Sequence, residues 1–502
     1  MEEMLKDCEV LAMYDVRGIQ SYIFKTNAAK EIIGASVLVS NVIIDGLNQF
    51  VKDNIDENQR QLYMTDWQND SDTAFQENSS VLMQVMFVGG GNAYVLFRSG
   101  EICRQVNRFL ARYILERTYS LNLAVAVVEK TDNYGDDYDS IQKKMRSIKA
   151  HMPSTQPMGA LPFMKVDSIT GYPLSKAING KRYSTEAALK RSAFPKQESE
   201  QIFDHMVTEK GDNSMLAVCH IDGNSMGMQI RDEMKNCITY DRAIPTMRDI
   251  SKEIAETFRG VFNGMVNYIE GVSSWVKGDS KYKLYREIIV AGDDITFVCN
   301  AKLAIPAVAY FLKHIGGADG KYSACGGIAF FNSHFPFSDA YQVAEACCES
   351  AKAKAKEANH RGDGGKIGNY FDFQICSNIS AARLDVYRQK HYTSNGTSFL
   401  ARPYYVTIEN DVYGLNKKNT ETTLDRLDYW LEFLSSMPRN KAKLLRDAIS
   451  VGPNQMEETI SFLKSRGYAA FFENKNEQNI WYDATEIMDL YIGGIAEDEN
   501  KN

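Results

Sequence analysis

The sequence predicts an α/β protein of the α+β type, built from two copies of one structural unit and a C-terminal helical region. Three short apolar segments occur twice in the chain, in the same order and at similar spacing. They lie at 11–20, 86–97 and 121–129, and again at 216–227, 288–298 and 322–331. Because a duplicated unit preserves the order and spacing of its segments, we interpret most of the first 375 residues as two such copies.

Each copy is predicted to contain a strand, a helix, a hairpin, a helix, a strand and a final helix. In the second copy, apolar residues recur at spacings of three and four along one helix face: Met247, Ile250, Ile254, Phe258, Val261, Met265 and Ile269. Paired apolar runs are joined only by Gly-Gly-Asn at 90–92 and by Gly-Asp-Asp at 292–294, which is typical of hairpins. We expect final helices near 138–149 and 339–356, and in each copy a largely antiparallel sheet covered by helices.

The predicted domain boundaries follow changes in composition. The first copy is assigned to 1–165 and the second, catalytic copy to 211–385. The polar stretch at 166–210, where both periodicities fade, is interpreted as a connector. Residues 386–502 are expected to form a C-terminal helical domain, because leucines recur there at helical spacing: Leu424, Leu427, Leu431 and Leu434.

The composition is that of a globular protein with several domains, with 502 residues of which 44% are hydrophobic and 24% charged. The acidic N-terminus does not resemble a signal peptide, and no apolar run is long enough to span a bilayer. We therefore expect a cytoplasmic protein with no membrane partner.

The nine cysteines include no CxxC pair, which favours buried free thiols over a zinc site. The net charge of −8 argues against an extended basic groove for nucleic acid.

The chemistry of the second copy is expected to reside in three carboxylates. Asp293 and Asp294 are adjacent at a tight turn between apolar strands, and Asp222 lies at the end of another apolar strand. Carboxylates held together in this way repel one another. A hard cation such as Mg²⁺ or Mn²⁺, completed by substrate phosphates, would stabilise them. We predict that all three are catalytic metal ligands, and that the strand ending at Asp222 lies beside the hairpin.

The alternative interpretation of Gly-Asp-Asp is a plain surface turn, in which these residue types are common. The chain contains a control for this alternative. Gly135, Asp136 and Asp137 form the same tripeptide without apolar flanks, and we expect them to be only a loop. The apolar flanks of Asp293 and the correctly spaced Asp222 favour a functional role for the hairpin at 292–294.

Small residues near the carboxylates are candidates for binding the phosphates of a nucleotide. A loop after the Asp222 strand opens a predicted helix, and backbone N–H groups at such positions bind anions. The candidates in this loop and in the hairpin turn are Gly223, Asn224, Ser225, Gly227 and Gly292. Lys352, on the last helix of the second copy, is a candidate triphosphate ligand; the alternative is a lysine on a solvated helix face.

The first copy has neutral residues where the second has its acidic hairpin. Asn92 cannot replace a carboxylate as a charge-neutralising metal ligand, so this copy is expected to be catalytically silent. Asp15 is a single carboxylate at a strand end and does not make a site by itself. The glycines would instead let a nucleotide, or the other copy, approach closely, so Gly90, Gly91 and Asn92 are candidate nucleotide-binding residues.

Taken together, these motifs resemble the polymerase-like large subunit of type III CRISPR effector complexes and its stand-alone minimal CRISPR polymerase relatives. The resemblance covers about residues 9–375. It rests on DVRGIQSYIF and FVGGGNAYVLF in the first copy, and on HIDGNSMG, AGDD, GGIAFF and AEACCESAK in the second. The RPYYV segment at 402–406 and the helices after it resemble the C-terminal helical domain of that subunit.

The resemblance implies two ferredoxin-like palm domains, related to diguanylate (GGDEF) and adenylate cyclases, in a pseudo-dimeric arrangement. It also implies magnesium or manganese, ATP as substrate, a cyclic oligoadenylate product and metal ligation by Asp222, Asp293 and Asp294. Three features depart from the family pattern. Ala291 replaces the first glycine of GGDD, no His-Asp dipeptide marks a fused HD nuclease, and the cysteine-bearing zinc insert is missing.

The leading hypothesis is a nucleotidyltransferase that condenses ATP into a cyclic oligonucleotide second messenger for CRISPR-related antiviral defence. Its partners would be nucleotide substrates and a downstream effector that senses the product. The two copies would face each other, the acidic copy holding the donor nucleotide and the silent copy the acceptor. The alternative is a scaffold that holds guide RNA and the other subunits of an effector complex, but the acidic cluster favours the enzyme. A template-directed polymerase is a third hypothesis, against which the acidic charge balance argues.

Overall fold

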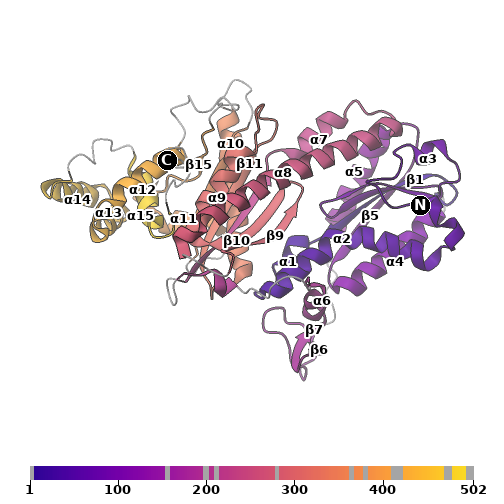
Figure 1. The fold of residues 1–502 in the computed structure, drawn as a ribbon, viewed down its shortest axis with the longest axis horizontal. Coiled ribbons are helices and arrows are strands. Elements are labelled where there is room, and N and C mark those ends of the chain that lie inside the picture. Colours follow the sequence, from indigo (N-terminus) through magenta and orange to yellow (C-terminus); the bar gives the residue numbers. More distant parts are fainter. Residues whose placement is uncertain are drawn as a thin grey trace. The chain divides into compact units, whose positions relative to one another are not determined.

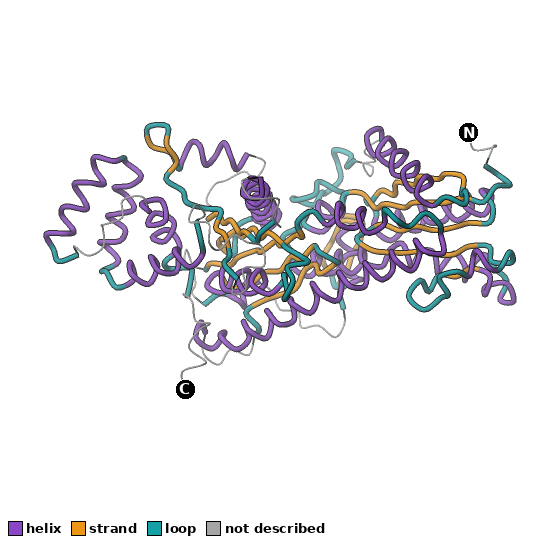
Figure 2. Tube along the Cα trace, turned by 90° about the horizontal axis from the view of Figure 1, so that it is seen from above, coloured by secondary structure: helices purple, strands orange, loops and turns teal. Residues whose placement is uncertain are grey.

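The computed structural model describes residues 5–152, 159–195, 203–208, 214–277, 282–360, 367–376, 383–408, 422–468 and 477–492. The chain divides into two compact units, and most of their helices and several strands are labelled in Figure 1. Unit 1 comprises Met1–Glu200 with Ser225–Glu256, and unit 2 comprises Gln201–Asn224 with Thr257–Asn502. In each unit, strands gather into a main sheet with helices beside it (Figure 2).

The main sheet of unit 1 carries the first predicted copy. Its strands lie in the order β2-β3-β4-β1-β5, and their bounds are β1 (Val10–Arg17), β2 (Tyr63–Met64), β3 (Met83–Gly89), β4 (Asn92–Phe97) and β5 (Asn122–Glu129). Strand β1 pairs antiparallel with β4 and β5, and β4 pairs antiparallel with β3. Helix α2 (Ala29–Asn54) precedes the hairpin and α4 (Gly100–Thr118) follows it, which gives the βαββαβ order of a ferredoxin-like fold.

The main sheet of unit 2 repeats this arrangement. Its strands are β8 (Met215–Gly223), β9 (Tyr285–Ala291), β10 (Asp294–Asn300), β11 (Ala324–Asn332), β12 (Tyr370–Ile375) and β15 (Tyr404–Tyr405). The sheet order is β15-β12-β11-β8-β10-β9, in which β9-β10-β8-β11 matches β3-β4-β1-β5 of unit 1 strand for strand. The two predicted copies and their antiparallel core are confirmed, while β12 joins β11 in parallel.

Helices cover both faces of the unit 2 sheet. On one face α9 (Ala301–His314) packs closely, since a Cβ added at Gly326 would lie 2.6 Å from a methyl carbon of Val308. On the other face lies α10 (Phe337–His360), whose backbone would be 1.9 Å from a Cβ added at Gly327. Neighbouring strand residues point to opposite faces, so these two glycines let both helices approach β11.

The helices of unit 1 follow the same plan. Helix α2 packs closely on α4, because a Cβ added at Gly46 would lie 2.4 Å from the Leu110 side chain. Helix α5 (Tyr134–His151) packs on β5 as α10 packs on β11.

Among the described helices, only α2 has the length and apolarity to cross a membrane, yet 56% of its most apolar stretch is buried, as in a core helix. The short helices of this region are α1 (Ile19–Ile23), η1 (Glu57–Leu62) and α3 (Ala74–Glu77).

The stretch at 166–210, predicted to be a connector, contains secondary structure of its own. It forms β6 (Leu174–Ile178), β7 (Lys181–Ser184), α6 (Thr185–Ala193) and η2 (Phe203–Met206). Helix α6 packs closely on α2, where a Cβ added at Gly34 would lie 1.8 Å from the Lys190 carbonyl oxygen. The Lys190 side chain is itself buried in an ion pair with Glu186 and donates to the carbonyl oxygen of Tyr22. Buried charges interrupt the apolar periodicity of a helix face, which hid α6 from the sequence analysis.

A second difference concerns the range 211–385 predicted for the catalytic copy. Within it, residues 225–256 group with unit 1. They form α7 (Met226–Met234) and the first part of α8 (Tyr240–Lys277). There Arg248 donates to the carbonyl oxygens of Val85 and Met86 on β3 and forms an ion pair with Asp72. Apolar periodicity correctly predicts a long helix, but it carries no information about which sheet the helix contacts.

The Gly-Asp-Asp tripeptide at 135–137 is not the loop that the sequence predicts, because it forms the first turn of α5. Asn133 caps this helix by accepting a hydrogen bond from the backbone N–H of Asp136. Asp137 is buried and accepts hydrogen bonds from the Thr131 backbone and from the Tyr240 hydroxyl, both at 2.7 Å. Carboxylates stabilise helix N-termini, so this tripeptide has a structural role.

The C-terminal region is mainly helical, as predicted, and belongs to unit 2. Its helices are α11 (Leu384–His391), α12 (Leu424–Ser435), α13 (Arg439–Val451), α14 (Pro453–Ser465) and α15 (Gln478–Ile487), with a small hairpin of β13 (Thr393–Ser394) and β14 (Thr397–Ser398). The nine cysteines are free thiols and eight of them are buried, which confirms the interpretation of their spacing.

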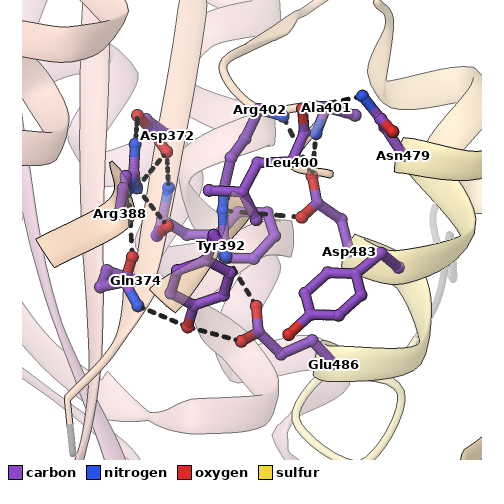
Figure 3. Close-up of polar contacts among 12 residues, drawn as sticks. Asp372, Gln374, Arg388, Tyr392, Leu400, Ala401, Arg402, Asn479, Asp483 and Glu486 are labelled. Atoms are coloured by element: carbon purple, nitrogen blue, oxygen red, sulfur yellow. Dashed lines mark hydrogen bonds and ion pairs between the residues drawn. The ribbon is translucent and has the colours of Figure 1, made fainter. Parts of the chain in front are cut away.

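A buried polar network joins helices α11 and α15 to the main sheet of unit 2 (Figure 3). The Arg402 side chain, from the RPYYV segment, donates to Glu486 at 2.7 Å and lies 3.6 Å from Asp483, both on α15. On the sheet side, Arg388 of α11 donates to both carboxylate oxygens of Asp372 on β12, at 2.7 and 2.9 Å. Because these buried charges are paired, the network fixes α11 and α15 against the edge of the sheet.

Candidate active site

The three predicted carboxylates lie at one end of the unit 2 sheet. Asp222 is the penultimate residue of β8, Asp293 lies in the turn between β9 and β10, and Asp294 begins β10. Strands β8 and β10 pair antiparallel with Ile221 opposite Ile295, so the next position along the ladder brings Asp222 and Asp294 to the same level. The prediction that the Asp222 strand lies beside the hairpin is confirmed.

The carboxyl groups of Asp222 and Asp293 lie close enough to influence each other's charge. Burial raises the pKa of Asp293 to about 6, and the negative charge of Asp222 adds to the increase. Two carboxylates in contact repel each other when both are ionised, so the pair needs a proton or a cation for stability. This electrostatic property distinguishes the turn from a plain surface turn.

A lysine from α10 supplies positive charge beside the pair. The Lys352 ammonium donates to Asp222 Oδ2 at 2.5 Å, and only 14% of the lysine side chain is exposed. Burial alone would lower the pKa of Lys352, but the Asp222 carboxylate outweighs it and raises that pKa. Glu349, on the same helix, lies 3.9 Å from the ammonium and is mostly exposed. Lys352 is therefore part of the site, and the alternative of a lysine on a solvated face is wrong.

His220 is a residue of this site that the sequence analysis did not select. Its Nδ1 lies 3.1 Å from Thr296 Oγ1 and 3.6 Å from Asp294 Oδ1, and the Tyr341 ring packs edge-on against the imidazole. Burial lowers the pKa of His220 to about 4, so the ring is neutral at neutral pH. His220 lies two residues before Asp222 and shares its face of β8, a period-two relation that the sequence alone contains.

The carboxylates supply some of the ligands that a divalent cation requires. Among the residues that the structure describes, no group of three or more His, Cys, Asp or Glu side chains could hold a metal ion by itself. Asp222 and Asp293 are in contact, whereas Asp294 lies toward His220. Magnesium is often bound by only one or two carboxylates, with substrate phosphates and water completing its octahedron. The Asp222–Asp293 pair fits a magnesium ion that is shared with a nucleotide.

The predicted phosphate-binding residues differ in their hydrogen bonds and backbone conformations. Asn224 has a structural role, because its side-chain amide donates to Ser323 Oγ at 3.1 Å and to the Gly368 carbonyl oxygen at 3.2 Å. Ser225 has a φ of 57° and precedes α7 without capping it through its side chain. Gly292 has a φ of 63° in the hairpin turn. Gly223 ends β8 and Gly227 belongs to the first turn of α7.

The first copy contains the same aspartate–lysine pair. Lys149 of α5 forms an ion pair with Asp15 of β1, as Lys352 of α10 does with Asp222 of β8. Each lysine lies 15 residues after the first residue of its helix, Tyr134 in α5 and Phe337 in α10. The equivalence of these lysines was not apparent from the sequence, because the helix starts had first to be located.

The two hairpin turns differ in charge and in backbone conformation. In the first copy, Asp15 is opposite the neutral Asn92, and both turn glycines have positive φ, 58° at Gly90 and 79° at Gly91. In the second copy only Gly292 has a positive φ, and Asp293 does not. The acidic turn thus needs one glycine and the neutral turn needs two.

Comparison with known families gives a match over the second copy, including α7 and the first part of α8. Residues 215–361 match the family model for the second palm domain of Cas10/Cmr2. This range includes Asp222, Asp293, Asp294 and Lys352, and the match confirms the resemblance drawn from the motifs.

Solved structures of related architecture were also found. A Csm1–Csm4 cassette in complex with cA4 is 11% identical with a TM-score of 0.49, covering 97% of this chain and 70% of that chain. Csm1 from T. onnurineus is 12% identical with a TM-score of 0.48, covering 96% and 69%. No curated protein sequence matches this chain.

Proposed function

We propose that this chain, whose residues 215–361 match the Cas10/Cmr2 second palm domain, is a nucleotidyltransferase that condenses ATP into a cyclic oligonucleotide messenger for antiviral defence in the cytoplasm. The observation that carries the proposal is the contact between Asp222 and Asp293 beside Lys352. Like charges held together at a turn destabilise a protein that has no ligand for them, so a pure scaffold would gain nothing from this arrangement.

Asp222 and Asp293 would hold a divalent cation, with Asp294 as the third candidate ligand. When bound, Mg²⁺ or Mn²⁺ would supply charge stabilisation to an attacking hydroxyl and a departing pyrophosphate. The chain contributes a rigid position for its carboxylates. Strand β8 is paired on both sides, by β10 and by β11, and the hairpin turn is only two residues long. A site fixed in advance spends little free energy on ordering when the substrate binds.

Lys352 and His220 would have different tasks around the carboxylates. Lys352 carries a positive charge that can neutralise a triphosphate oxygen as a point charge. His220 is neutral, contacts Thr296 and lies next to Asp294, so it can hold Asp294 in place without repelling a cation. The neutral hairpin of the first copy would position the second nucleotide, which supplies the attacking hydroxyl and needs no carboxylates of its own.

The Cas10/Cmr2 match also favours a second role, that of a large subunit in a type III effector complex. In that role the chain would contact other subunits and guide RNA, and catalysis would take place within the complex. The two roles share one active site, so Mg²⁺-dependent ATP binding by the purified chain tests that site for both, and product formation by the chain alone tests the first role.

The proposal is tested by combining ATP binding with product analysis. A ligand that binds only the folded state raises the unfolding temperature, so Mg²⁺ should increase the shift produced by ATP in the wild-type chain and not in Asp222→Asn. Mass spectrometry of reactions with ATP and Mg²⁺ should show cyclic oligonucleotides in the wild type. Equal thermal shifts with and without Mg²⁺, together with no nucleotide product, would refute the enzyme.

A further inference from the structure

The carboxylate that would bind a cation is already neutralised by a side chain of the same chain. Asp222 Oδ2 accepts from the Lys352 ammonium at 2.5 Å, and the lysine side chain is 14% exposed. An ammonium at that distance occupies the position that a metal ion would need on the same oxygen. Metal and lysine therefore compete for Asp222, and like charges so close together would repel strongly.

The first copy shows what the same pair does where no metal is expected. Lys149 and Asp15 occupy the equivalent positions, but the residue opposite Asp15 is Asn92 and the turn contains only glycines. No second carboxylate of that hairpin competes for the lysine. In the second copy, by contrast, Asp293 lies beside Asp222, and this pair of carboxylates has more negative charge than Lys352 alone can neutralise when both are ionised.

We propose that Lys352 is a displaceable counterion that makes metal binding at Asp222 depend on nucleotide. This inference rests on the proposed function. In the nucleotide-free protein the Lys352 ammonium occupies Asp222 and weakens metal binding. When a metal–triphosphate complex binds, the Lys352 ammonium would move from Asp222 to a phosphate oxygen, which would leave the Asp222 carboxylate available to hold the cation. Lys149 remains on Asp15 throughout.

The geometry of Lys352 allows this exchange. The lysine stem has four rotatable bonds, so its ammonium can move several ångströms without any change in the α10 backbone. Glu349 lies 3.9 Å from the ammonium and offers a second anion on the same helix. A triphosphate carries more negative charge than one carboxylate and would be the stronger partner. Coupling of this kind is reciprocal: if nucleotide strengthens metal binding, metal strengthens nucleotide binding by the same factor.

The first test measures Mn²⁺ affinity without nucleotide, by electron paramagnetic resonance of the free ion. Lys352→Met removes the competing charge and keeps the length of the side chain, so it should bind Mn²⁺ about tenfold more tightly than the wild type, a typical size for coupling between sites. Lys352→Arg keeps the charge and should bind as weakly as the wild type. Lys149→Met, the matched change in the first copy, should have no effect. Equal Mn²⁺ affinity in the wild type and Lys352→Met would overturn the proposal.

The second test asks whether the Lys352 side chain moves, because removal of its charge could change Mn²⁺ affinity without any displacement. Reductive methylation followed by mass spectrometry reports how accessible each amine is. Saturating Mg²⁺ without nucleotide should increase the labelling of Lys352, and addition of a non-hydrolysable ATP analogue should protect it again, while Lys149 should not change. Labelling of Lys352 that is unaffected by Mg²⁺ would overturn the exchange.

Failure of the proposed function would give a different result. If neither the wild type nor Lys352→Met binds Mn²⁺, with or without the ATP analogue, the site is not a metal–nucleotide site and both proposals are wrong. If the wild type binds Mn²⁺ together with the analogue but Lys352→Met shows no gain without it, only the role of Lys352 is wrong. Circular dichroism of each variant confirms that the comparison is made between folded proteins.

Discussion

The two palm-like sheets of this chain share a scaffold and differ in the residues of one turn. Both place an aspartate on an inner strand, at Asp15 and Asp222, and both pair it with a lysine from the helix that follows β5 or β11. Next to this pair the sheets differ in the hairpin turn, which is neutral in unit 1 and acidic in unit 2. The Asp–Lys pair is therefore common to both sheets, whereas the proposed metal site requires the acidic turn, which unit 1 lacks.

The backbone makes this difference hard to reverse. Gly91 has a φ of 79°, a conformation that aspartate adopts only at a cost, and a Cβ there would lie 2.3 Å from the Ile19 side chain. Asp293, at the equivalent position, has no such conformation. An acidic pair placed in the first hairpin would strain the turn, so the asymmetry between the copies is built into the backbone as well as the side chains.

The largest effect is expected from removal of the acidic turn. The double variant Asp293→Asn/Asp294→Asn should lose nucleotide condensation by about a thousandfold or more, because the charge stabilisation that a bound metal supplies is worth several kcal/mol. Product formation measured by mass spectrometry checks this. Asp136→Asn, in the structural Gly-Asp-Asp of α5, is the control and should retain activity. Substantial turnover in the double variant would show that the acidic hairpin is not required for condensation.

The matched aspartates provide the second test. Asp222→Asn should reduce condensation by at least about a hundredfold, since it removes a metal ligand. Asp15→Asn breaks the equivalent ion pair in the first copy and should change the rate less than about fivefold, the range of a single ion pair of modest strength. The measurement is the condensation rate of each variant at saturating ATP and Mg²⁺. Equal losses in both variants would show that the copies share the chemistry.

The edges of the two sheets also differ, and the Arg402 network tests this difference. In the described part of the chain, the unit 2 sheet continues beyond β11, with β12 and β15, whereas the unit 1 sheet ends at β5. Arg402→Ala leaves Asp483 and Glu486 without their buried cation and should destabilise unit 2 by about 3–5 kcal/mol. Three of the four tryptophans, Trp275, Trp430 and Trp481, belong to unit 2, so fluorescence during denaturant unfolding reports mainly on that unit.

A matched surface pair is the control for Arg402. Arg112 and Glu116 on α4 form an ion pair in which 79% and 59% of the side chains are exposed. Arg112→Ala should leave the denaturant midpoint essentially unchanged, because solvent screens exposed pairs. If Arg402→Ala were as mild, the network in Figure 3 would not be what holds α15 to the sheet.

The smallest effect is expected from bulk in the neutral hairpin. A Cβ added at Gly90 would have no described atom within 4 Å, so Gly90→Trp projects a ring outward and strains only the turn. If this hairpin positions the second nucleotide, condensation should fall about tenfold, as misplaced reactants lose orientation. Gly180→Trp, at another open turn glycine with a φ of 77°, applies similar strain elsewhere and should leave the rate unchanged. Equal rates in both variants would exclude the neutral hairpin from the site.

Much of the fold could be predicted from the sequence because its signals are local. Alternating apolar residues, hairpin glycines and the i, i+3, i+4 pattern of α8 depend on backbone sterics within a few residues. The repeat then related two sets of such signals and correctly predicted that β8 lies beside the hairpin. The sequence also predicts Asp222, Asp293 and Asp294 as candidate site residues, because carboxylates between apolar strands are unusual in a plain turn.

The tertiary structure alone decided which distant residues meet. Lys352 was a candidate from the sequence, but it is 130 positions from Asp222, and only the structure shows that the two side chains form an ion pair. Its selection depends on where α10 begins and on Gly327, which lets the helix approach the sheet closely. Helix α6 and the grouping of 225–256 with unit 1 were missed for the same reason. Contacts between segments far apart in the chain depend on the packing of whole elements, and local patterns do not encode that packing.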